Sequence, residues 1–201
     1  MSRRAERTLP PGYFEALYAA DPDPWRFASS DYERDKYAAT IAALPRPRYG
    51  RAFEIGCSIG VLTAQLAARC DALLAVDAAE APLAAAQARC AGLPKVAFRR
   101  MAVPADWPEG RFDLILLSEV VYYLDAADGA RLARRVAESL TPGGEALLVH
   151  WTEETDYPLS GDAATEGFIA AAGLPVIRQQ RAARYRLDLL GRQGSGPDPS
   201  P

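Results

Sequence analysis

Short apolar runs alternate with longer, alanine-rich amphipathic segments from about Arg51 onwards. This alternation is typical of βα units around a parallel sheet. The apolar runs predict seven strands, at Ala52–Ile55, Ala72–Val76, Val96–Arg99, Phe112–Leu117, Ala146–Val149, Val176–Gln180 and Ala183–Leu190. Because almost nothing separates the last two strands, we expect them to form an antiparallel hairpin at one edge of the sheet.

The amphipathic segments predict helices over Gly60–Arg69, Glu80–Ala91 and Asp128–Leu140. The Thr-Pro-Gly-Gly sequence that follows Leu140 is expected to end the last of them. Two more helices are predicted ahead of the first strand, over about Gly12–Ala20 and Tyr32–Ala43. The pattern therefore predicts an α/β fold with a seven-stranded, mostly parallel sheet, helices and a terminal antiparallel hairpin.

The segment between the two N-terminal helices, Asp21-Pro22-Asp23-Pro24-Trp25-Arg26-Phe27, is called the proline strap here. Each proline fixes its own φ, lacks an N–H and favours an extended conformation of the aspartate before it. The strap is thus predicted to be stiff and kinked, neither helix nor strand. We expect a helical N-terminal segment over 1–48, the α/β domain over 49–191, and a Gly, Pro and Ser-rich disordered tail over 192–201.

Composition places the chain among ordinary globular proteins, since 49% of its 201 residues are hydrophobic and 24% are charged. The formal net charge of −3 provides no basic footprint for nucleic acid or an anionic membrane surface. Apolar runs such as Leu114–Leu117 are too short to span a bilayer, and the N-terminus lacks a signal-type apolar core. We therefore expect a cytoplasmic protein with no nucleic-acid or membrane partner.

Three widely spaced cysteines, Cys57, Cys70 and Cys90, suit reduced thiols rather than a disulfide framework or a zinc site. With one histidine in the chain, a metal centre built from protein ligands is not expected. A monomer is favoured, although nothing in the sequence determines the oligomeric state.

The first predicted strand leads into Glu54-Ile55-Gly56-Cys57-Ser58-Ile59-Gly60, and a helix follows at once. Glycines in such a turn let a ligand approach the backbone, and the helix N-terminus supplies free N–H groups. A dinucleotide site requires G-x-G-x-x-G, whereas Ser58 occupies the position of the middle glycine. Asp77 closes the next strand, where a carboxylate accepts hydrogen bonds from both ribose hydroxyls. The pattern indicates one nucleoside; alternatively, both acids cap strand ends and the glycines only serve a tight turn.

This spacing resembles that of class I S-adenosylmethionine (SAM)-dependent methyltransferases over about Arg51 to Leu190, which implies a Rossmann-like fold with helices on both faces. By this resemblance, Gly56, Cys57 and Gly60 lie at the methionine part of SAM, Asp77 and Ala78 at the ribose, and Met101 and Ala102 at the adenine. Glu54, Ser118 and Glu119 are also expected to bind the cofactor. The acidic residue usual at the adenine position is absent from this sequence.

The reacting centre is expected at the carboxyl ends of the fourth and fifth predicted strands, where ligands of open α/β sheets bind. Glu119, Tyr122, Tyr123, His150 and Trp151 gather there. Methyl transfer needs a nucleophile with a free lone pair, so an ammonium acceptor must first lose a proton. We expect Glu119 to anchor the cation and either Glu119 or His150 to take the proton. The alternatives are structural: a satisfied core histidine, a capping glutamate, and packing by one of the two adjacent tyrosines.

Seven aromatic residues fall within the first 37 positions, around the proline strap. The run Asp-Pro-Asp-Pro-Trp, followed by S-x-Y-E-x-x-K-Y at Ser30 to Tyr37, resembles the nodulation protein S (NodS) family, and the likeness extends from about Tyr13 to Gly161. The resemblance implies N-methylation of the free amine of a deacetylated chitooligosaccharide. It implies a lid whose Asp21, Asp23 and Trp25 face cofactor or substrate. The residues expected on the acceptor side are Tyr32, Tyr122, Tyr123 and Trp151. On the helix after the strap, Arg34 or Lys36 is expected to pair with the SAM carboxylate. The alternative for the two cations is an exposed charged face, and for the rings packing on the sheet.

We therefore expect a SAM-dependent methyltransferase that N-methylates an amino group on a chitooligosaccharide or amino-sugar-type acceptor and releases S-adenosylhomocysteine (SAH). One alternative is O-methylation of a small hydroxylated acceptor, with His150 as the base. Another is a regulator that binds SAM without turnover. The expected partner is a small-molecule or oligosaccharide acceptor.

Overall fold

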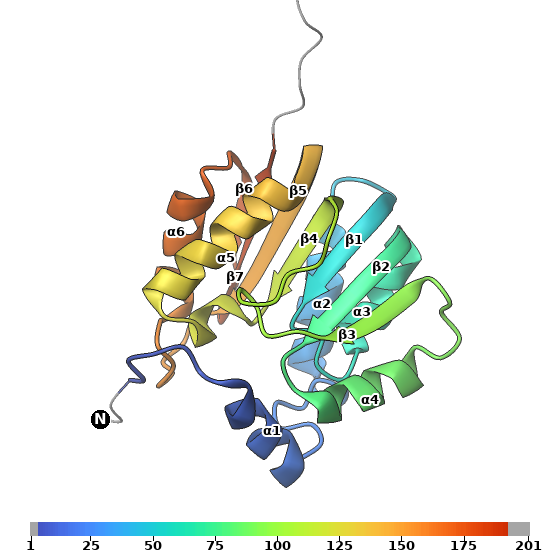
Figure 1. The fold of residues 1–201 in the computed structure, drawn as a ribbon, viewed down its shortest axis with the longest axis vertical. Coiled ribbons are helices and arrows are strands. Elements are labelled where there is room, and N and C mark those ends of the chain that lie inside the picture. Colours follow the sequence, from blue (N-terminus) through green and yellow to red (C-terminus); the bar gives the residue numbers. More distant parts are fainter. Residues whose placement is uncertain (1–3, 193–201) are drawn as a thin grey trace, which may run out of the picture.

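A single seven-stranded sheet organises the chain in the computed structural model, which describes residues 4–192 (Figure 1). Its order is β3-β2-β1-β4-β5-β7-β6. The strands are β1 (Tyr49–Ile55), β2 (Cys70–Asp77), β3 (Val96–Arg100), β4 (Phe112–Ser118), β5 (Leu140–Trp151), β6 (Val176–Arg181) and β7 (Tyr185–Gly191). The first five are parallel, and β7 is antiparallel to both β5 and β6. The predicted mostly parallel sheet with a terminal hairpin is confirmed; the predicted tail, except for Arg192, lies outside the described residues.

The helices are α1 (Pro11–Ala20), α2 (Asp31–Ala43), α3 (Val61–Leu66), α4 (Glu80–Arg89), α5 (Ala126–Ser139) and α6 (Gly161–Ala172), with 3₁₀ turns η1 (Ala67–Arg69) and η2 (Val121–Tyr123). Within residues 4–192, none of them combines the length and apolar character needed to cross a membrane. Helix α6 had not been predicted. Its boundaries nevertheless carry ordinary signals, because the Ser160 side chain caps the N-terminus and Gly173 adopts a left-handed φ of 62° at the C-terminus.

Strand β5 begins six residues earlier than expected. Leu140 pairs with Phe112 and Glu145 pairs with Leu114, so the pairing shifts register across the intervening Thr-Pro-Gly-Gly. That sequence ends α5 at Ser139, as predicted, and then forms an irregularity at the start of the strand.

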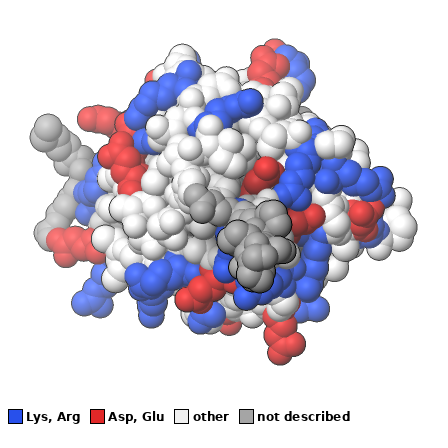
Figure 2. Space-filling model, turned by 90° about the horizontal axis from the view of Figure 1, so that it is seen from above, with Lys and Arg blue, Asp and Glu red and all other residues white. Residues whose placement is uncertain are grey.

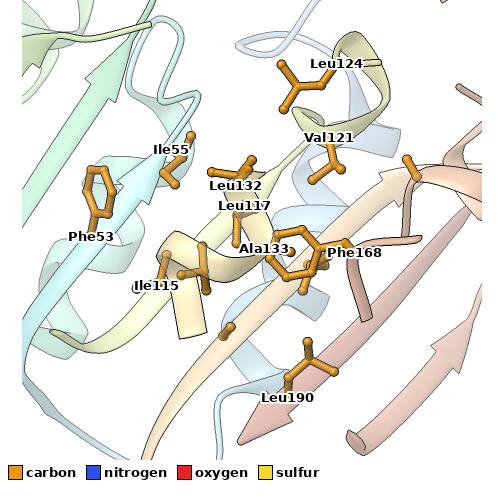
Figure 3. Packing of buried hydrophobic residues seen from close by; sticks show 14 of the residues in the cluster. Phe53, Ile55, Ile115, Leu117, Val121, Leu124, Leu132, Ala133, Phe168 and Leu190 are labelled. Atoms are coloured by element: carbon orange, nitrogen blue, oxygen red, sulfur yellow. The ribbon is translucent and has the colours of Figure 1, made fainter. Parts of the chain in front are cut away.

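The core lies on both faces of the sheet because side chains alternate along β4. Ile115 and Leu117 point toward α5 and α6, where they pack with Leu132 and Phe168 (Figure 3). Leu114 and Leu116 belong to the opposite cluster with residues of α2 and α3. Helices therefore cover both faces of the sheet, and the sheet determines where the loops after β1, β2 and β4 begin (Figure 1).

The N-terminal segment packs on the loops at the carboxyl ends of β1 and β2. Tyr18 of α1 is buried against Ile59 and Ala79, with Trp25 and Phe27 of the proline strap beside it. The strap contains neither helix nor strand, as predicted. On the surface, Lys and Arg side chains are interspersed with Asp and Glu in the face shown in Figure 2.

Candidate active site

The turn between β1 and α3 requires glycine at two positions. Gly56 has a φ of 80°, and a Cβ at this residue would collide with Cγ2 of Val120. Gly60 has a φ of 78°, and a Cβ there would lie 2.9 Å from Cβ of Ala86. Both conformations are readily available to glycine. The turn is therefore pressed closely against the loop after β4 and against α4.

Glu54 is buried at the start of this turn, with 1% of its surface exposed. Its Oε2 has no hydrogen-bond partner among the described residues, and burial raises its pKa to about 7. It lines a small cavity, called the loop cavity, together with Gly56, Cys57, Ser118 and Glu119. A buried carboxyl oxygen without a hydrogen-bond partner in such a place suits a ligand that brings a hydrogen-bond donor.

Asp77 lies at the carboxyl end of β2 and organises the neighbouring loops. Its Oδ2 accepts a hydrogen bond from the Ser58 N–H at 2.9 Å, and its Oδ1 accepts one from the Ala79 N–H at 3.0 Å. Burial raises its pKa, and these N–H groups oppose the rise. A carboxylate has about four acceptor positions. Asp77 thus keeps acceptor capacity for a ligand after holding both loops in place.

A cavity of about 240 Å³, called the strand-end cavity, lies beside Asp77. Among the residues proposed to bind the cofactor, its walls include Trp25, Gly56, Asp77, Ala78, Met101, Ala102, Ser118 and Glu119. Residues of α1 and the segment before it, such as Thr8 and Phe14, complete the wall. The sequence segments expected around one nucleoside therefore border one cavity.

A second cavity, of about 250 Å³, shares Trp25 with the strand-end cavity as a wall residue and is called the aromatic cavity. Its walls are Trp25, Phe27, Tyr32, Tyr122, Tyr123, Trp151 and Tyr157, with the polar residues Ser30, Glu33, Lys36, Glu119 and Thr155. The Tyr32 and Trp151 rings meet edge to face at 5.5 Å, and Tyr122 stacks on Tyr157 at 5.3 Å. The four residues predicted for the acceptor side therefore lie together.

Glu119 stands where these spaces meet, because it lines all three cavities. Its Oε1 lies 2.5 Å from Nζ of Lys36, while its Oε2 accepts hydrogen bonds from the Tyr122 hydroxyl at 2.6 Å and the Trp151 N–H at 2.8 Å. Burial favours the neutral acid, but Lys36 and the other donors outweigh it and hold the pKa of Glu119 below its usual value. The lowered pKa and these three donors favour the ionised form of Glu119, which fits its expected role as an anchor for a cation.

His150 does not reach the aromatic cavity. It is fully buried, its Nε2 accepts a hydrogen bond from the Val121 N–H at 3.1 Å, and its Nδ1 lies 3.3 Å from the Thr165 hydroxyl. Burial lowers its pKa to about 4. Both ring nitrogens are engaged in holding η2 and α6 against β5, so the geometry argues against the expected role of His150 as a general base.

Four other predicted site residues also lie off the three cavity walls. Arg34 is exposed and pairs with Asp31 and Asp35 on the surface of α2. Asp23 accepts hydrogen bonds from the Phe27 and Ala28 N–H groups, and Asp21 accepts one from the Asp23 N–H. These aspartates fold the proline strap on itself. Gly60 shapes the turn from behind, against α4.

Sequence reasoning did not assign a role to Glu33, which lies one turn before Lys36 on α2. The two side chains are 7% and 2% exposed and form an ion pair. Residues three positions apart share one face of a helix. That spacing is a sequence signal for a pair on one helix face, whereas the burial of the pair is seen only in the structure.

Comparisons with known proteins identify the family. The model of the family Nodulation protein S (NodS) matches residues 15–150. Nodulation protein S of Rhizobium tropici is 31% identical over 132 residues, which are 65% of this chain and 55% of that protein. Nodulation protein S of Sinorhizobium fredii is 28% identical over 131 residues, or 64% of this chain and 61% of that protein. The chain thus matches less than two thirds of the length of these relatives.

Solved structures share the fold. A proposed methyltransferase from Pseudomonas syringae is 38% identical and covers 80% of this chain and 99% of its own, with a TM-score of 0.72. The N-methyltransferase NodS from Bradyrhizobium japonicum WM9, solved with SAH, is 21% identical and covers 90% of this chain and 97% of its own, with a TM-score of 0.76. The sheet is that of class I methyltransferases, and because the family model matches more than half of the sequence, the chain belongs to the Nodulation protein S (NodS) family.

Proposed function

We propose that this chain is a SAM-dependent methyltransferase that methylates a free amino group on an amino-sugar-type or chitooligosaccharide acceptor and releases SAH. The observation that carries the proposal is the position of Glu119, which borders both the strand-end cavity and the aromatic cavity. Two ligands bound in these cavities would meet at this residue. Family membership and the SAH complex of a NodS protein with the same fold support the choice of cofactor.

The residues around the strand-end cavity fit SAM. Asp77 has acceptor positions left for ribose hydroxyls, and Met101 and Ala102 offer an apolar wall for the adenine. The close turn at Gly56 admits the ligand to the backbone, and the orphaned Oε2 of Glu54 suits its ammonium group. When bound, SAM supplies a methyl group activated by a sulfonium.

Charge in the aromatic cavity favours a cationic acceptor. Two carboxylates, Glu33 and Glu119, share the single ammonium of Lys36, so the ionised cluster carries a net negative charge. Lys36 and Arg184 already lie over the Tyr32 ring, and Arg184 also lies over the Trp151 ring, so the carboxylates rather than these two rings would hold an ammonium group. The aromatic walls provide apolar surface for a sugar. An amino sugar presents both features, and we propose a small-molecule or oligosaccharide acceptor of this kind.

O-methylation is the less favoured reading of the site. A hydroxyl acceptor needs a strong base, and His150 was the expected one. In the structure its Nε2 accepts the Val121 N–H, away from the aromatic cavity. The net negative charge of the cavity would also discriminate against forming an alkoxide there.

Calorimetric titration with SAH tests the cofactor, using the wild-type chain and Asp77→Ala. We expect binding by the wild type and a loss of at least about tenfold in the variant, since two or more hydrogen bonds to a charged group disappear. Methylation assays with glucosamine-bearing acceptors and their hydroxyl counterparts then test the acceptor. Methylation confined to the hydroxyl compounds would replace the proposal with O-methylation, and SAH binding without any turnover would favour a regulator.

A further inference from the structure

Glu33 occupies a buried position in the aromatic cavity. It projects from the first turn of α2, is 7% exposed, and its Oε1 accepts a hydrogen bond from Nζ of Lys36 at 3.0 Å. Its Oε2 lies 2.9 Å from the same Nζ without hydrogen-bonding geometry, and the Tyr37 hydroxyl lies close to the same carboxyl. Glu33 therefore lines the cavity with a carboxyl group that accepts one hydrogen bond from Lys36, although a carboxylate has about four acceptor positions.

The two carboxyl groups that share Lys36 differ in their surroundings. Glu119 accepts hydrogen bonds from Lys36, the Tyr122 hydroxyl and the Trp151 N–H. Glu33 faces Tyr32, Lys36 and the Tyr37 hydroxyl on its own helix, and the carboxylate of Glu119 across the cavity. Burial raises the pKa of Glu33 despite Lys36, whereas the pKa of Glu119 is held low. Pairs of acids separated in this way divide into a permanent anion and a proton acceptor.

We infer that Glu33 takes the proton that the acceptor ammonium must lose before methyl transfer, while Glu119 remains ionised and holds the cation in place. The inference rests on the proposed function. It gives the buried Glu33–Lys36 pair of the S-x-Y-E-x-x-K-Y sequence a role in the reaction, which neither Glu119 nor His150 is placed to perform.

The step balances without any further reactant. The N–H bond of the ammonium breaks, its proton passes to the Glu33 carboxylate, and the nitrogen keeps the electron pair. That pair forms the new C–N bond to the methyl carbon as the C–S bond breaks, and the electrons of the C–S bond stay on sulfur, which yields SAH. Glu33 then returns its proton to solvent.

Lys36 is not the base. Burial lowers its pKa, but Glu119 and Glu33 outweigh this effect and raise it above the usual value for lysine. The amine therefore stays protonated at neutral pH. Its role is to balance one of the two carboxylates, so that the cavity accepts a single additional cation.

The test is the pH dependence of kcat for wild type, Glu33→Gln and Glu33→Asp on a glucosamine-bearing acceptor. Asp35→Asn is the matched control, because it removes a carboxylate from the same helix at an exposed position. We expect Glu33→Gln to lower kcat at neutral pH by about 100-fold or more, with unchanged SAH affinity. Its remaining activity should rise with pH, since only acceptor that is already deprotonated reacts. Glu33→Asp should retain part of the activity and the wild-type pH profile, and Asp35→Asn should match the wild type.

Three results would overturn the inference: wild-type kcat in Glu33→Gln, a loss of equal size at every pH, or a loss of SAH affinity in that variant. The second would assign Glu33 to positioning, and the third to the integrity of the fold. Failure of the proposed function itself would look different, because the wild-type chain would then bind SAH and methylate no amine.

Discussion

At the scale of single residues, backbone conformation and side-chain chemistry at this site depend on each other. Glu119 has a φ of 58°, an unfavourable conformation for a residue with a side chain. In this conformation it accepts the Trp151 N–H and reaches Lys36. A strained residue held by several polar contacts is a frequent feature of functional sites.

Gly56 offers a direct test at this scale. Replacement by alanine would place a methyl group against Val120 at a φ that alanine avoids, so we expect a loss of about 1 to 3 kcal/mol in unfolding free energy and of most SAH affinity. Denaturant unfolding and calorimetry measure the two effects. Gly167→Ala in α6 is the control, because a Cβ there meets no atom within 4 Å among the described residues. Equal stability of the two variants would contradict the assigned crowding.

At the scale of elements, helix α2 joins the N-terminal segment to the sheet through apolar packing and one buried ion pair. Lys36 is 2% exposed and Glu119 at the end of β4 is 11% exposed, and their charged atoms lie 2.5 Å apart. Breaking a buried pair leaves a charge without compensation. The ion pair and the apolar packing therefore hold α2 beside the aromatic cavity.

We expect Lys36→Met to lower the unfolding free energy by about 3 to 5 kcal/mol, since it leaves both carboxylates without their shared cation. Arg34→Met, two positions earlier on the exposed side of the helix, should leave both stability and SAH affinity unchanged. Chemical denaturation measures the unfolding free energy of both variants, and calorimetry measures their SAH affinity. A loss of SAH binding in Arg34→Met would restore the predicted contact of Arg34 with the cofactor.

The elements also show where sequence reasoning works. Strands such as β4 carry dense apolar runs that are buried on both faces, and these were predicted within one residue. Helix α6 was missed because Phe168 is the one large side chain among its buried residues, Gly161, Ala164, Thr165 and Phe168, so its local pattern is weak. Packing on α5 and η2 stabilises α6, although its own apolar periodicity is weak.

Site residues were likewise predicted where their position in the sequence pattern determines where they lie. Asp77 and Glu119 were predicted from their places at strand ends, which the topology of the sheet brings together. His150 follows the predicted fifth strand, but in the structure it lies within β5 and its ring is buried in the core, where its Nε2 accepts a hydrogen bond from the Val121 N–H. The direction of the His150 side chain and the burial of Glu33 depend on tertiary contacts, which the periodicity of the sequence does not reveal.

At the scale of the whole molecule, two buried groups oppose each other in the response of stability to acid. The pKa of His150 falls from 6.5 to about 4, so the unfolded chain binds more protons in this range and His150 makes stability increase with pH. The pKa of Glu54 rises from 4.5 to about 7, so the folded chain binds more protons there and Glu54 makes stability decrease with pH. Between about pH 4.5 and 6.5 the two effects nearly cancel, each amounting to about 3 kcal/mol in full.

Single variants should expose each effect. Relative to wild type, His150→Gln should gain stability as the pH falls from 6.5 toward 4, because it removes the group that must stay neutral in the fold. Glu54→Gln should show the reverse, gaining on wild type as the pH rises from 4.5 to 7. Urea unfolding of the three proteins across this range measures the differences, in which contributions from Glu33, Asp77 and Glu119 cancel. Parallel curves for variant and wild type would show that the buried group in question titrates alike in the folded and unfolded chains.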